Sequence, residues 1–269
     1  MHHILADILS YKKREVERAK EQQPPAQLEA RVAALPPARD FKVPLQGDRV
    51  ALIAEVKFKS PSRGMIREDL DLEDVVTAYR EAGTEAISVL TDRRFFGGAE
   101  HYLRDARRMT EQPLLRKDFI IDPYQIYQSR CLGADAVLLI AKIVPPGKLR
   151  QYIQLSRQLG LQVLVECRTE EEIAAALEGG AEIIGINNRD LDTFETDLQA
   201  TLRLAPALRD QGVVVVSESG IWEREHVMML SDAGVNGVLV GEALMASADL
   251  KGKALSLRGV PALRKAVSL

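Results

Sequence analysis

The stretch PLLRKDFIIDPYQIYQSRCLGADAVLLI, residues 113–140, places two short apolar runs on either side of one amphipathic segment. The runs, 113–117 and 136–140, are rich in Leu, Ile and Val and have the length of buried strands. The segment between them, 124–134, has helical length and contains Gly133 near its end, a common helix C-terminus. A strand, a helix and a second strand in this order predict a parallel β-α-β unit.

The same alternation of apolar runs and amphipathic segments continues along most of the 269-residue chain. Eight units of similar length, with no inserted second domain, favour a closed (β/α)8 TIM barrel of the α/β class over the alternative, a doubly wound open sheet. We expect the barrel to span residues 50–250. Its strands are predicted at 51–56, 86–90, 113–117, 136–140, 162–166, 182–186, 213–217 and 237–241.

Residues 1–49 do not join this alternation and are expected to form an N-terminal helical extension. The stretch ILADILSYKKREVERAKE, residues 4–21, predicts one amphipathic helix with an apolar stripe. Because so short a segment cannot bury a core of its own, the stripe needs another surface to cover, either on the barrel or at an oligomer contact. Residues 251–269 are expected to form a C-terminal tail. The stripe consists of Ile4, Leu5, Ile8 and Leu9.

The composition argues against several classes of protein and site. Hydrophobic residues make up 46% and charged residues 28% of the chain, which is ordinary for a globular protein. The formal net charge of −3 gives no general attraction to nucleic acid or an anionic membrane, and no apolar run approaches the ~20 residues of a membrane span. The four histidines share no metal-ligand spacing, and Cys131 and Cys167 match neither a zinc site nor a CxxC motif. We expect a soluble, cytoplasmic protein with free thiols and no metal.

Charged side chains occur at the ends of several predicted strands, where the active sites of such barrels lie. Counting by two from Ile53 leads to Glu55 and Lys57, so both should point into the barrel mouth. One alternative is that these charges only mark where each strand meets water. A mixed group of acids and bases in a partly closed mouth is, however, what acid-base catalysis requires. The same count places four more side chains there: Lys117, Glu166, Asn187 and Arg189.

The last two predicted strands end in small residues that lead into helices. Ser219 and Gly220 follow one strand, and Gly241 and Glu242 follow the next. Small residues let backbone N–H groups approach a ligand closely, and helix N-termini favour anions. In this fold the corresponding loops frequently bind phosphate, so we expect a phosphorylated ligand there.

Seven motifs together resemble the indole-3-glycerol phosphate synthase family, from about residue 4 to about residue 250. The motifs from the first, third and sixth strands are the specific ones. The resemblance implies ring closure of 1-(2-carboxyphenylamino)-1-deoxyribulose 5-phosphate with loss of carbon dioxide and water, a step of tryptophan biosynthesis that uses no metal or organic cofactor. The motifs are AEVKFKSPSRG, SVLTDRRFFGG, LLRKDFIIDPYQ, LVECRTEEE, GINNRDL, SESGI and LVGEALM.

The resemblance also implies roles for the charged residues. Lys117 matches the general acid of ring closure and Glu166 the general base. Lys57 matches a lysine that meets the substrate carboxylate and is a candidate acid for dehydration, while Glu55 matches the carboxylate that orients the lysines. The sequence leaves open which lysine protonates at which step.

The remaining matched positions concern binding. Asn187 and Arg189 match residues that hold the substrate, with Arg189 supporting Glu166 electrostatically, and Phe119 matches a wall of the aromatic pocket. Family members often carry Ser at the position of Glu242, so we expect its backbone to bind phosphate, its side chain to point away and its replacement by Ser to be near neutral. The phosphate side is matched by Ser60, Ser219, Gly220, Gly241 and Glu242.

Two other functions fit these residues less well. A phosphosugar isomerase such as phosphoribosylanthranilate isomerase would not need two inward lysines with two glutamates. A non-catalytic barrel that binds a phosphorylated metabolite or a partner would be expected to lack an acid or a base, and none is missing. We expect a monomer or weak homo-oligomer with no nucleic-acid or membrane partner. The resemblance implies that the apolar stripe of the extension packs beside the barrel mouth, so deleting residues 1 to about 45 is expected to raise the Michaelis constant more than it lowers thermal stability.

Overall fold

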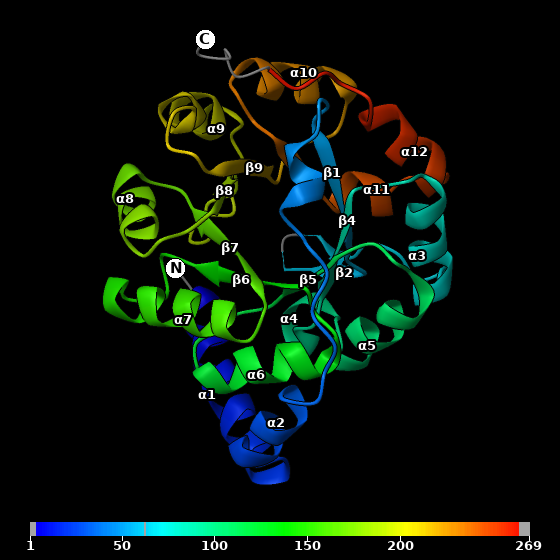
Figure 1. Ribbon diagram of the computed structural model, residues 1–269. Coiled ribbons are helices and arrows are strands. Elements are labelled where there is room, and N and C mark those ends of the chain that lie inside the picture. Colours follow the sequence, from blue (N-terminus) through cyan, green and yellow to red (C-terminus); the bar gives the residue numbers. More distant parts are fainter. Residues whose placement is uncertain (1–3, 62, 264–269) are drawn as a thin grey trace.

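Eight parallel strands form a closed barrel in the computed structural model, which describes residues 4–61 and 63–263 (Figure 1). The strands follow one another around the barrel in chain order, and β1 pairs with both β4 and β10. The closed ring confirms the TIM barrel and excludes the open sheet. The strands are β1 (Ala51–Val56), β4 (Ala86–Leu90), β5 (Leu114–Lys117), β6 (Ala136–Ile140), β7 (Gln162–Cys167), β8 (Ile183–Asn187), β9 (Val214–Glu218) and β10 (Gly237–Val240).

Helices surround the barrel and begin and end on local sequence signals. Asp71 and Asp122 each close a capping box at the start of a helix, and Gly133 ends α6 in the left-handed conformation with φ +91°. A short hairpin, β2 (Lys59–Ser60) with β3 (Gly64–Met65), follows β1. The outer helical elements are α3 (Leu72–Glu81), α4 (Arg93–Phe96), α5 (Glu100–Met109), α6 (Pro123–Leu132), α7 (Pro146–Gln158), α8 (Glu170–Glu178), α9 (Gln199–Leu204), η2 (Ala205–Leu208), α10 (Arg224–Asp232), α11 (Glu242–Met245) and α12 (Leu250–Leu257).

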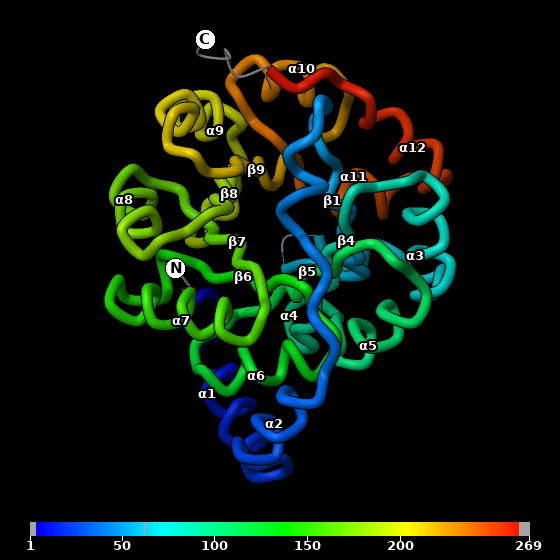
Figure 2. Tube along the Cα trace, viewed as in Figure 1, coloured from blue at the N-terminus to red at the C-terminus, as the bar shows by residue number. Residues whose placement is uncertain are grey.

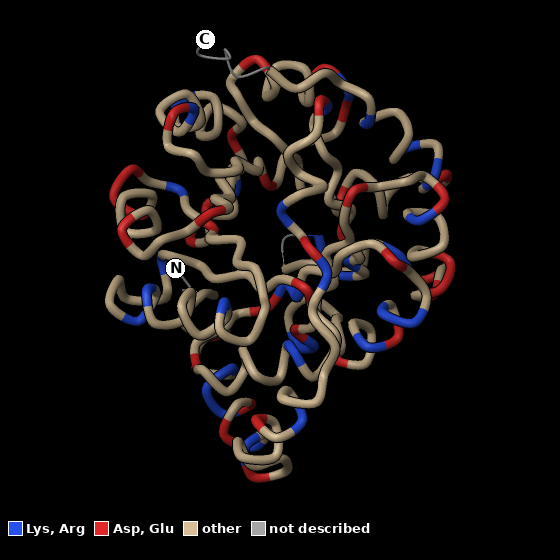
Figure 3. Tube along the Cα trace, viewed as in Figure 1, with Lys and Arg blue, Asp and Glu red and all other residues tan. Residues whose placement is uncertain are grey.

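The core has two apolar layers because successive strand residues point to opposite faces. One layer lies between strands and helices, and the other fills the barrel interior. Interior side chains such as Ile53, Leu115, Leu164 and Val216 are buried, and each is followed two residues later by a charged side chain. Figure 3 shows charged residues on the strands around the barrel centre as well as on the outer helices.

The N-terminal extension contacts both ends of the barrel. Helix α1 (Ile4–Gln22) buries Ile8 in the interior layer at the mouth, and Ile4 and Leu5 pack against the same layer, which confirms the expected position for three of the four stripe residues. Helix α2 (Pro25–Val32) then packs against α6. The following segment crosses the barrel toward β1 (Figure 2) and includes the 3-10 turn η1 (Val43–Gln46).

The opposite end of the barrel is closed by Phe41 and Leu45, a contact that the sequence did not indicate. Both side chains are buried in the interior layer. The amide of Phe41 donates a hydrogen bond to the side chain of Gln162, the first residue of β7, and so lies at the N-terminal end of the strands. The extension therefore contacts the barrel at both its mouth and its base.

The last described segment belongs to the outer shell of the barrel. Helix α12 runs across the expected boundary at residue 250 and packs against α3 and α11. Beyond it, the carbonyl of Val260 accepts the amide N–H of Val50 at 2.8 Å, so this part of the tail joins the chain just before β1. Residues 264–269 of the expected tail lie outside the described residues. In the described part of the chain, no helix has the length and hydrophobicity needed to cross a membrane.

Candidate active site

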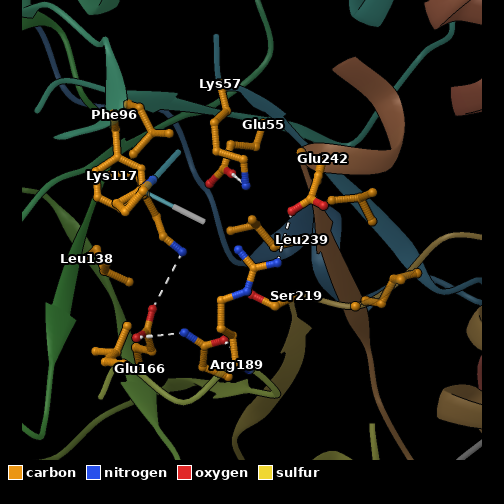
Figure 4. A pocket seen from close by; sticks show the side chains of 18 of the residues that line it. Glu55, Lys57, Phe96, Lys117, Leu138, Glu166, Arg189, Ser219, Leu239 and Glu242 are labelled. Atoms are coloured by element: carbon orange, nitrogen blue, oxygen red, sulfur yellow. Dashed lines mark hydrogen bonds and ion pairs between the residues drawn. The ribbon is translucent and has the colours of Figure 1, made fainter. Parts of the chain in front are cut away.

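A cavity opens at the C-terminal ends of the strands, where acid-base residues and glycine loops meet (Figure 4). Among the candidate residues, only Ser60 does not line it. Ser60 is buried in β2, and its hydroxyl accepts a hydrogen bond of 3.3 Å from the amide of Arg63. The predicted residues that line the cavity are Glu55, Lys57, Lys117, Phe119, Glu166, Asn187, Arg189, Ser219, Gly220, Gly241 and Glu242.

Lys117 lies at the end of β5 between two carboxylates. Its Nζ atom is paired with Glu218 and lies 3.5 Å from Oε2 of Glu166. Burial alone would lower the pKa of Lys117, but the carboxylates of Glu218 and Glu166 raise it more, so the pKa lies above its ordinary value. Lys117 is therefore protonated at neutral pH and can donate a proton to a bound group.

Glu166 lies at the end of β7 and is oriented by its neighbour on β8. Nδ2 of Asn187 donates a hydrogen bond of 3.0 Å to Oε1 of Glu166, and Oδ1 of Asn187 accepts the amide N–H of Arg189 at 2.9 Å. The second bond fixes which way the amide points, because an oxygen must face the Arg189 N–H. One carboxylate oxygen of Glu166 is thus held by Asn187 while the other faces Lys117.

Glu55 and Lys57 form a second acid-base pair at the end of β1, with 2.9 Å between Oε1 and Nζ. Burial raises the pKa of Glu55, but Lys57 and then Lys117 lower it more, so the carboxyl stays ionised. A Cβ atom at Gly241 would come within 2.5 Å of Oε1 of Glu55, so glycine there makes room for this carboxylate. Lys57 faces the cavity and can meet an anionic group.

Glu218, which was not predicted from the sequence, pairs with Lys117 beneath the cavity lining. It ends β9 with the inward parity of Val214 and Val216, so the count by two that identified Lys117 would also have found it. Burial raises the pKa of Glu218 to about 7, with Lys117 lowering it and Glu166 raising it. Its Oε1 atom is buried without a hydrogen-bond partner, and a Cβ atom at Gly185 would collide with it. Glu218 can therefore exchange a proton near neutral pH.

Glu242 departs from the expectation that its side chain points away from the phosphate side. It begins α11, lines the cavity and is paired with two arginines, Arg189 at 2.9 Å and Arg63 at 2.5 Å. The guanidinium of Arg63 also lies over the ring of Trp222, 5.1 Å from its centroid. The two positive charges offset the carboxylate, so it need not repel a phosphate, and its side chain holds both arginines in place.

The two glycine loops have the backbone geometry expected of an anion site. Ser219 and Gly220 both adopt left-handed conformations, with φ +69° and +77°. This conformation is uncommon for serine and turns the chain sharply at the end of β9. A Cβ atom at Gly220 would lie 2.7 Å from Cγ2 of Thr196, so the position has no room for a side chain. Gly241 and Glu242 follow β10, the strand that pairs with β9, so the two loops are neighbours at the cavity.

An apolar wall closes the other side of the cavity and suits an aromatic ring. Phe119, predicted from the resemblance, lies 5.9 Å from the ring of Phe96 on α4. Phe96 and Trp222 line the cavity too. Among the described residues, no three His, Cys, Asp or Glu side chains are grouped so that they could hold a metal ion.

The sequence is similar along nearly its whole length to proteins of one family. The family model described as indole-3-glycerol phosphate synthase matches residues 5–257. A protein of that name from Roseiflexus sp. (strain RS-1) is 46% identical over 267 residues, which cover 96% of this chain and 99% of the relative. Another, from Chlorobium phaeovibrioides (strain DSM 265 / 1930), is 45% identical over 249 residues, which cover 92% of this chain and 96% of the relative.

Solved structures with the same barrel have much lower sequence identity. A 3-hexulose-6-phosphate synthase matches with a TM-score of 0.63 at 15% identity, covering 77% of this chain and 98% of that chain. A thiamine phosphate pyrophosphorylase from Pyrococcus furiosus matches with a TM-score of 0.57 at 18% identity, covering 77% and 93%. These structures show the fold alone. The family match and the relatives aligned over nearly their whole length show that the chain belongs to the indole-3-glycerol phosphate synthase family.

Proposed function

We propose that the protein is an indole-3-glycerol phosphate synthase, a carbon-carbon lyase of tryptophan biosynthesis. It would convert 1-(2-carboxyphenylamino)-1-deoxyribulose 5-phosphate into indole-3-glycerol phosphate, carbon dioxide and water. The observation that carries the proposal is the placement of Lys117 between two carboxylates beside an apolar wall and two glycine loops. Such a cavity offers an acid, bases, a surface for an aromatic ring and a place for a phosphate.

Ring closure needs a proton donor at the sugar carbonyl. As the aromatic carbon attacks the ketone carbon, the carbonyl oxygen gains negative charge and must be protonated. Lys117 is protonated and largely buried, so it can hydrogen-bond to this oxygen and give it a proton. Loss of carbon dioxide then restores the aromaticity of the benzene ring.

Dehydration needs an acid for the departing hydroxyl and a base for a ring proton. Glu166 is proposed as the base, because Asn187 orients its carboxylate toward the cavity. Lys57 is a candidate for the acid and for the group that meets the substrate carboxylate, with Glu55 holding its Nζ atom. Glu218 is proposed as a group that returns protons to Lys117, because the two side chains are paired and its pKa is raised to about 7.

Substrate binding is assigned to the two sides of the cavity. The turn at Ser219 and Gly220 and the start of α11 at Gly241 and Glu242 would hold the phosphate through backbone N–H groups, with Arg189 adding positive charge. Phe119 and Phe96 would contact the benzene ring. Ser60 does not line the cavity, although its neighbour Pro61 does, and its hydroxyl would support the β2–β3 hairpin by accepting the amide N–H of Arg63.

The test is to incubate the purified protein with the carboxyphenylamino-deoxyribulose phosphate and follow the appearance of indole fluorescence. Formation of indole-3-glycerol phosphate, and its loss in Lys117→Ala, would support the proposal. Turnover of phosphoribosylanthranilate alone would favour an isomerase, whereas binding of either compound without turnover would favour a non-catalytic barrel.

We also propose that the protein acts in the cytoplasm, as a monomer or a weak homo-oligomer, without nucleic-acid or membrane partners. The modest net charge of −3 supports the absence of a general attraction to polyanions. Light scattering coupled to size-exclusion chromatography would test the oligomeric state, and a mass above that of a dimer at micromolar concentration would contradict it.

A further inference from the structure

The N-terminal helix carries a buried cation that the proposed chemistry does not use. Lys12 is only 2% exposed, although lysine is almost never fully buried unless it is paired. Its Nζ atom lies 2.9 Å from Oδ1 of Asp118, 3.0 Å from Oδ2 of Asp92 and 2.7 Å from Oε2 of Glu15. Asp118 and Asp92 are as buried as Lys12 and come from two loops at the barrel mouth. We call Lys12, Asp92 and Asp118 the Lys12 cluster.

Asp92 connects the cluster to one wall of the cavity. Its Oδ1 accepts the amide N–H of Phe95 at 2.8 Å and so caps helix α4, while its backbone carbonyl accepts the amide N–H of Gly98 at 2.8 Å. Helix α4 is a single turn and has little stability of its own. It carries Phe96, whose ring lines the cavity. The position of this ring therefore depends on Asp92.

Asp118 connects the same cation to the proposed general acid. It stands between Lys117 and Phe119, and its Oδ1 accepts the amide N–H of Phe119 at 2.8 Å. Its Oδ2 accepts hydrogen bonds from the hydroxyl of Thr91 at 2.5 Å and from Arg116 at 3.1 Å. Thr91 also donates its amide N–H to the carbonyl of Lys117 at 3.1 Å. The backbone that follows Lys117 is thus tied to Asp118, directly through the Phe119 amide and indirectly through Thr91, and the side chain of the preceding Arg116 pairs with Asp118 as well.

We propose that Lys12 is a positioning residue for the reaction, which holds the Lys117 segment and helix α4 at a fixed separation by pairing with Asp118 and Asp92. This inference rests on the proposed function. Lys12 does not line the cavity and so acts only through its two partners. The extension would then contribute to catalysis through an ionic contact on its buried side, in addition to covering the mouth with Ile8.

The electrostatics of the cluster explain why a neutral side chain could not replace Lys12. Two buried carboxylates facing each other repel, and the cation between them offsets both charges. Without Lys12, Asp118 would keep its contact with Arg116, but Asp92 would have lost the cation next to its Oδ2 atom. The two loops would then separate or take in water, and Lys117 and Phe96 would move relative to the substrate. A displacement of about 1 Å in a reacting group can cost about a hundredfold in rate.

Helix α1 supplies a matched control in Lys20. Its Nζ atom lies 2.8 Å from Oδ2 of Asp122, which caps α6, so it also pairs α1 with a residue that follows β5. Lys20 is partly exposed, and neither it nor Asp122 lines the cavity. The variants Lys12→Met and Lys20→Met therefore both remove a lysine of α1 that pairs with an N-cap aspartate. They differ because only the aspartate paired with Lys12 caps a helix whose side chain lines the cavity.

The test compares the kinetics of the two variants in the full-length protein. Lys12→Met should lower kcat about tenfold to a hundredfold with a smaller change in KM, while Lys20→Met should keep kcat within about twofold. Adding Asp92→Asn to Lys12→Met should restore part of kcat, because asparagine still caps α4 but no longer leaves an unpaired buried charge. Equal kcat values in Lys12→Met and wild type, at a temperature where both are folded, would overturn the proposal.

A readout independent of turnover separates this proposal from the function itself. Amide hydrogen exchange should speed up at residues 91–98 and 117–119 in Lys12→Met and remain unchanged there in Lys20→Met. Failure of the wild-type protein to make the indole product would reject the function, yet the exchange pattern would still decide the role of Lys12. If Lys12→Met does not fold, the double variant with Lys12→Met and Asp92→Asn replaces it in both measurements. The proposal would be overturned if this folded double variant had the kcat and the exchange rates of the wild type.

Discussion

Asn187 donates a hydrogen bond of 3.0 Å to the carboxylate of Glu166, and its side-chain Oδ1 accepts the backbone N–H of Arg189. The bond requires one oxygen of Glu166 to act as an acceptor. It therefore fixes the orientation of the carboxylate that is proposed as the general base.

Replacing Asn187 with Asp tests this relationship. A second carboxylate would stand beside Glu166, and like charges this close do not ionise independently. We expect kcat to fall about tenfold or more, with the acidic limb of the pH–rate profile displaced to higher pH. Asn187→Ala should lower the rate without that displacement. An unchanged acidic limb in Asn187→Asp would separate Asn187 from the proposed base.

Replacing Lys117 with Ala should preserve the barrel but lower turnover by roughly a hundredfold or more, the scale of general acid-base catalysis. Lys142→Ala is the control, because Lys142 pairs with Asp192 at 2.6 Å on the exposed side of the mouth. Steady-state kinetics and circular dichroism of both variants would give the comparison. Near-normal turnover in a folded Lys117→Ala protein would remove Lys117 from the role of acid.

Glu218 should make the stability of the protein depend on pH. Because its pKa is raised from 4.5 to about 7 in the folded protein, the folded state binds this proton more tightly than the unfolded chain does. Its contribution to stability is therefore greatest at low pH and is lost as the pH rises from about 4.5 to about 7, by on the order of 3 kcal/mol.

Glu218→Gln removes this titration. The free energy of unfolding of the variant, measured against wild type by urea denaturation between pH 5 and 8, should improve relative to wild type as the pH rises. A difference that stays constant across this range would show that Glu218 keeps an ordinary carboxylate titration in the folded protein.

The proposed phosphate site can be tested by two substitutions that should raise KM for different physical reasons. Gly220→Val should raise KM and also strain the fold, since φ is +77° there and a Cβ atom would meet Thr196. Contrary to the sequence expectation that Glu242→Ser is near neutral, we now expect it to raise KM severalfold, because Arg189 and Arg63 lose their shared partner. Glu242→Gln keeps an acceptor and should have a smaller effect. An unchanged KM in Glu242→Ser would mean that Arg189 and Arg63 keep their positions without the carboxylate.

Phe41 offers a substitution that should affect stability alone. It is 0% exposed at the end of the barrel away from the cavity, so Phe41→Ala should cost about 3–5 kcal/mol of folding free energy and leave kcat/KM unchanged. Deleting residues 1–45 would remove this contact together with α1, so we expect a large drop in Tm as well as weaker binding. Lower kcat/KM in folded Phe41→Ala would link the base of the barrel to the site.

The strands and most of the site could be predicted because they follow a period that is visible in a single chain. Counting by two located Lys117 and Glu166 correctly, and the same count applied to β9 would have found Glu218. Two features lie outside any local pattern. The pairing of Glu242 with Arg63 joins loops from opposite ends of the barrel sequence, and Phe41 reaches the base of the barrel from an irregular segment.

The double attachment of the extension also constrains how the chain can be made. The extension leaves the ribosome before its partners are synthesised. Asp122, the partner of Lys20, follows 102 residues later, and Gln162, the partner of Phe41, follows 121 residues later. Contacts this distant in sequence form slowly because a long loop must close first. During synthesis, the side of α1 that carries Ile8 and Lys12 has nothing to cover it. We therefore expect docking of the extension to be a late step of folding, and the nascent chain to be a client for chaperones until β7 has emerged.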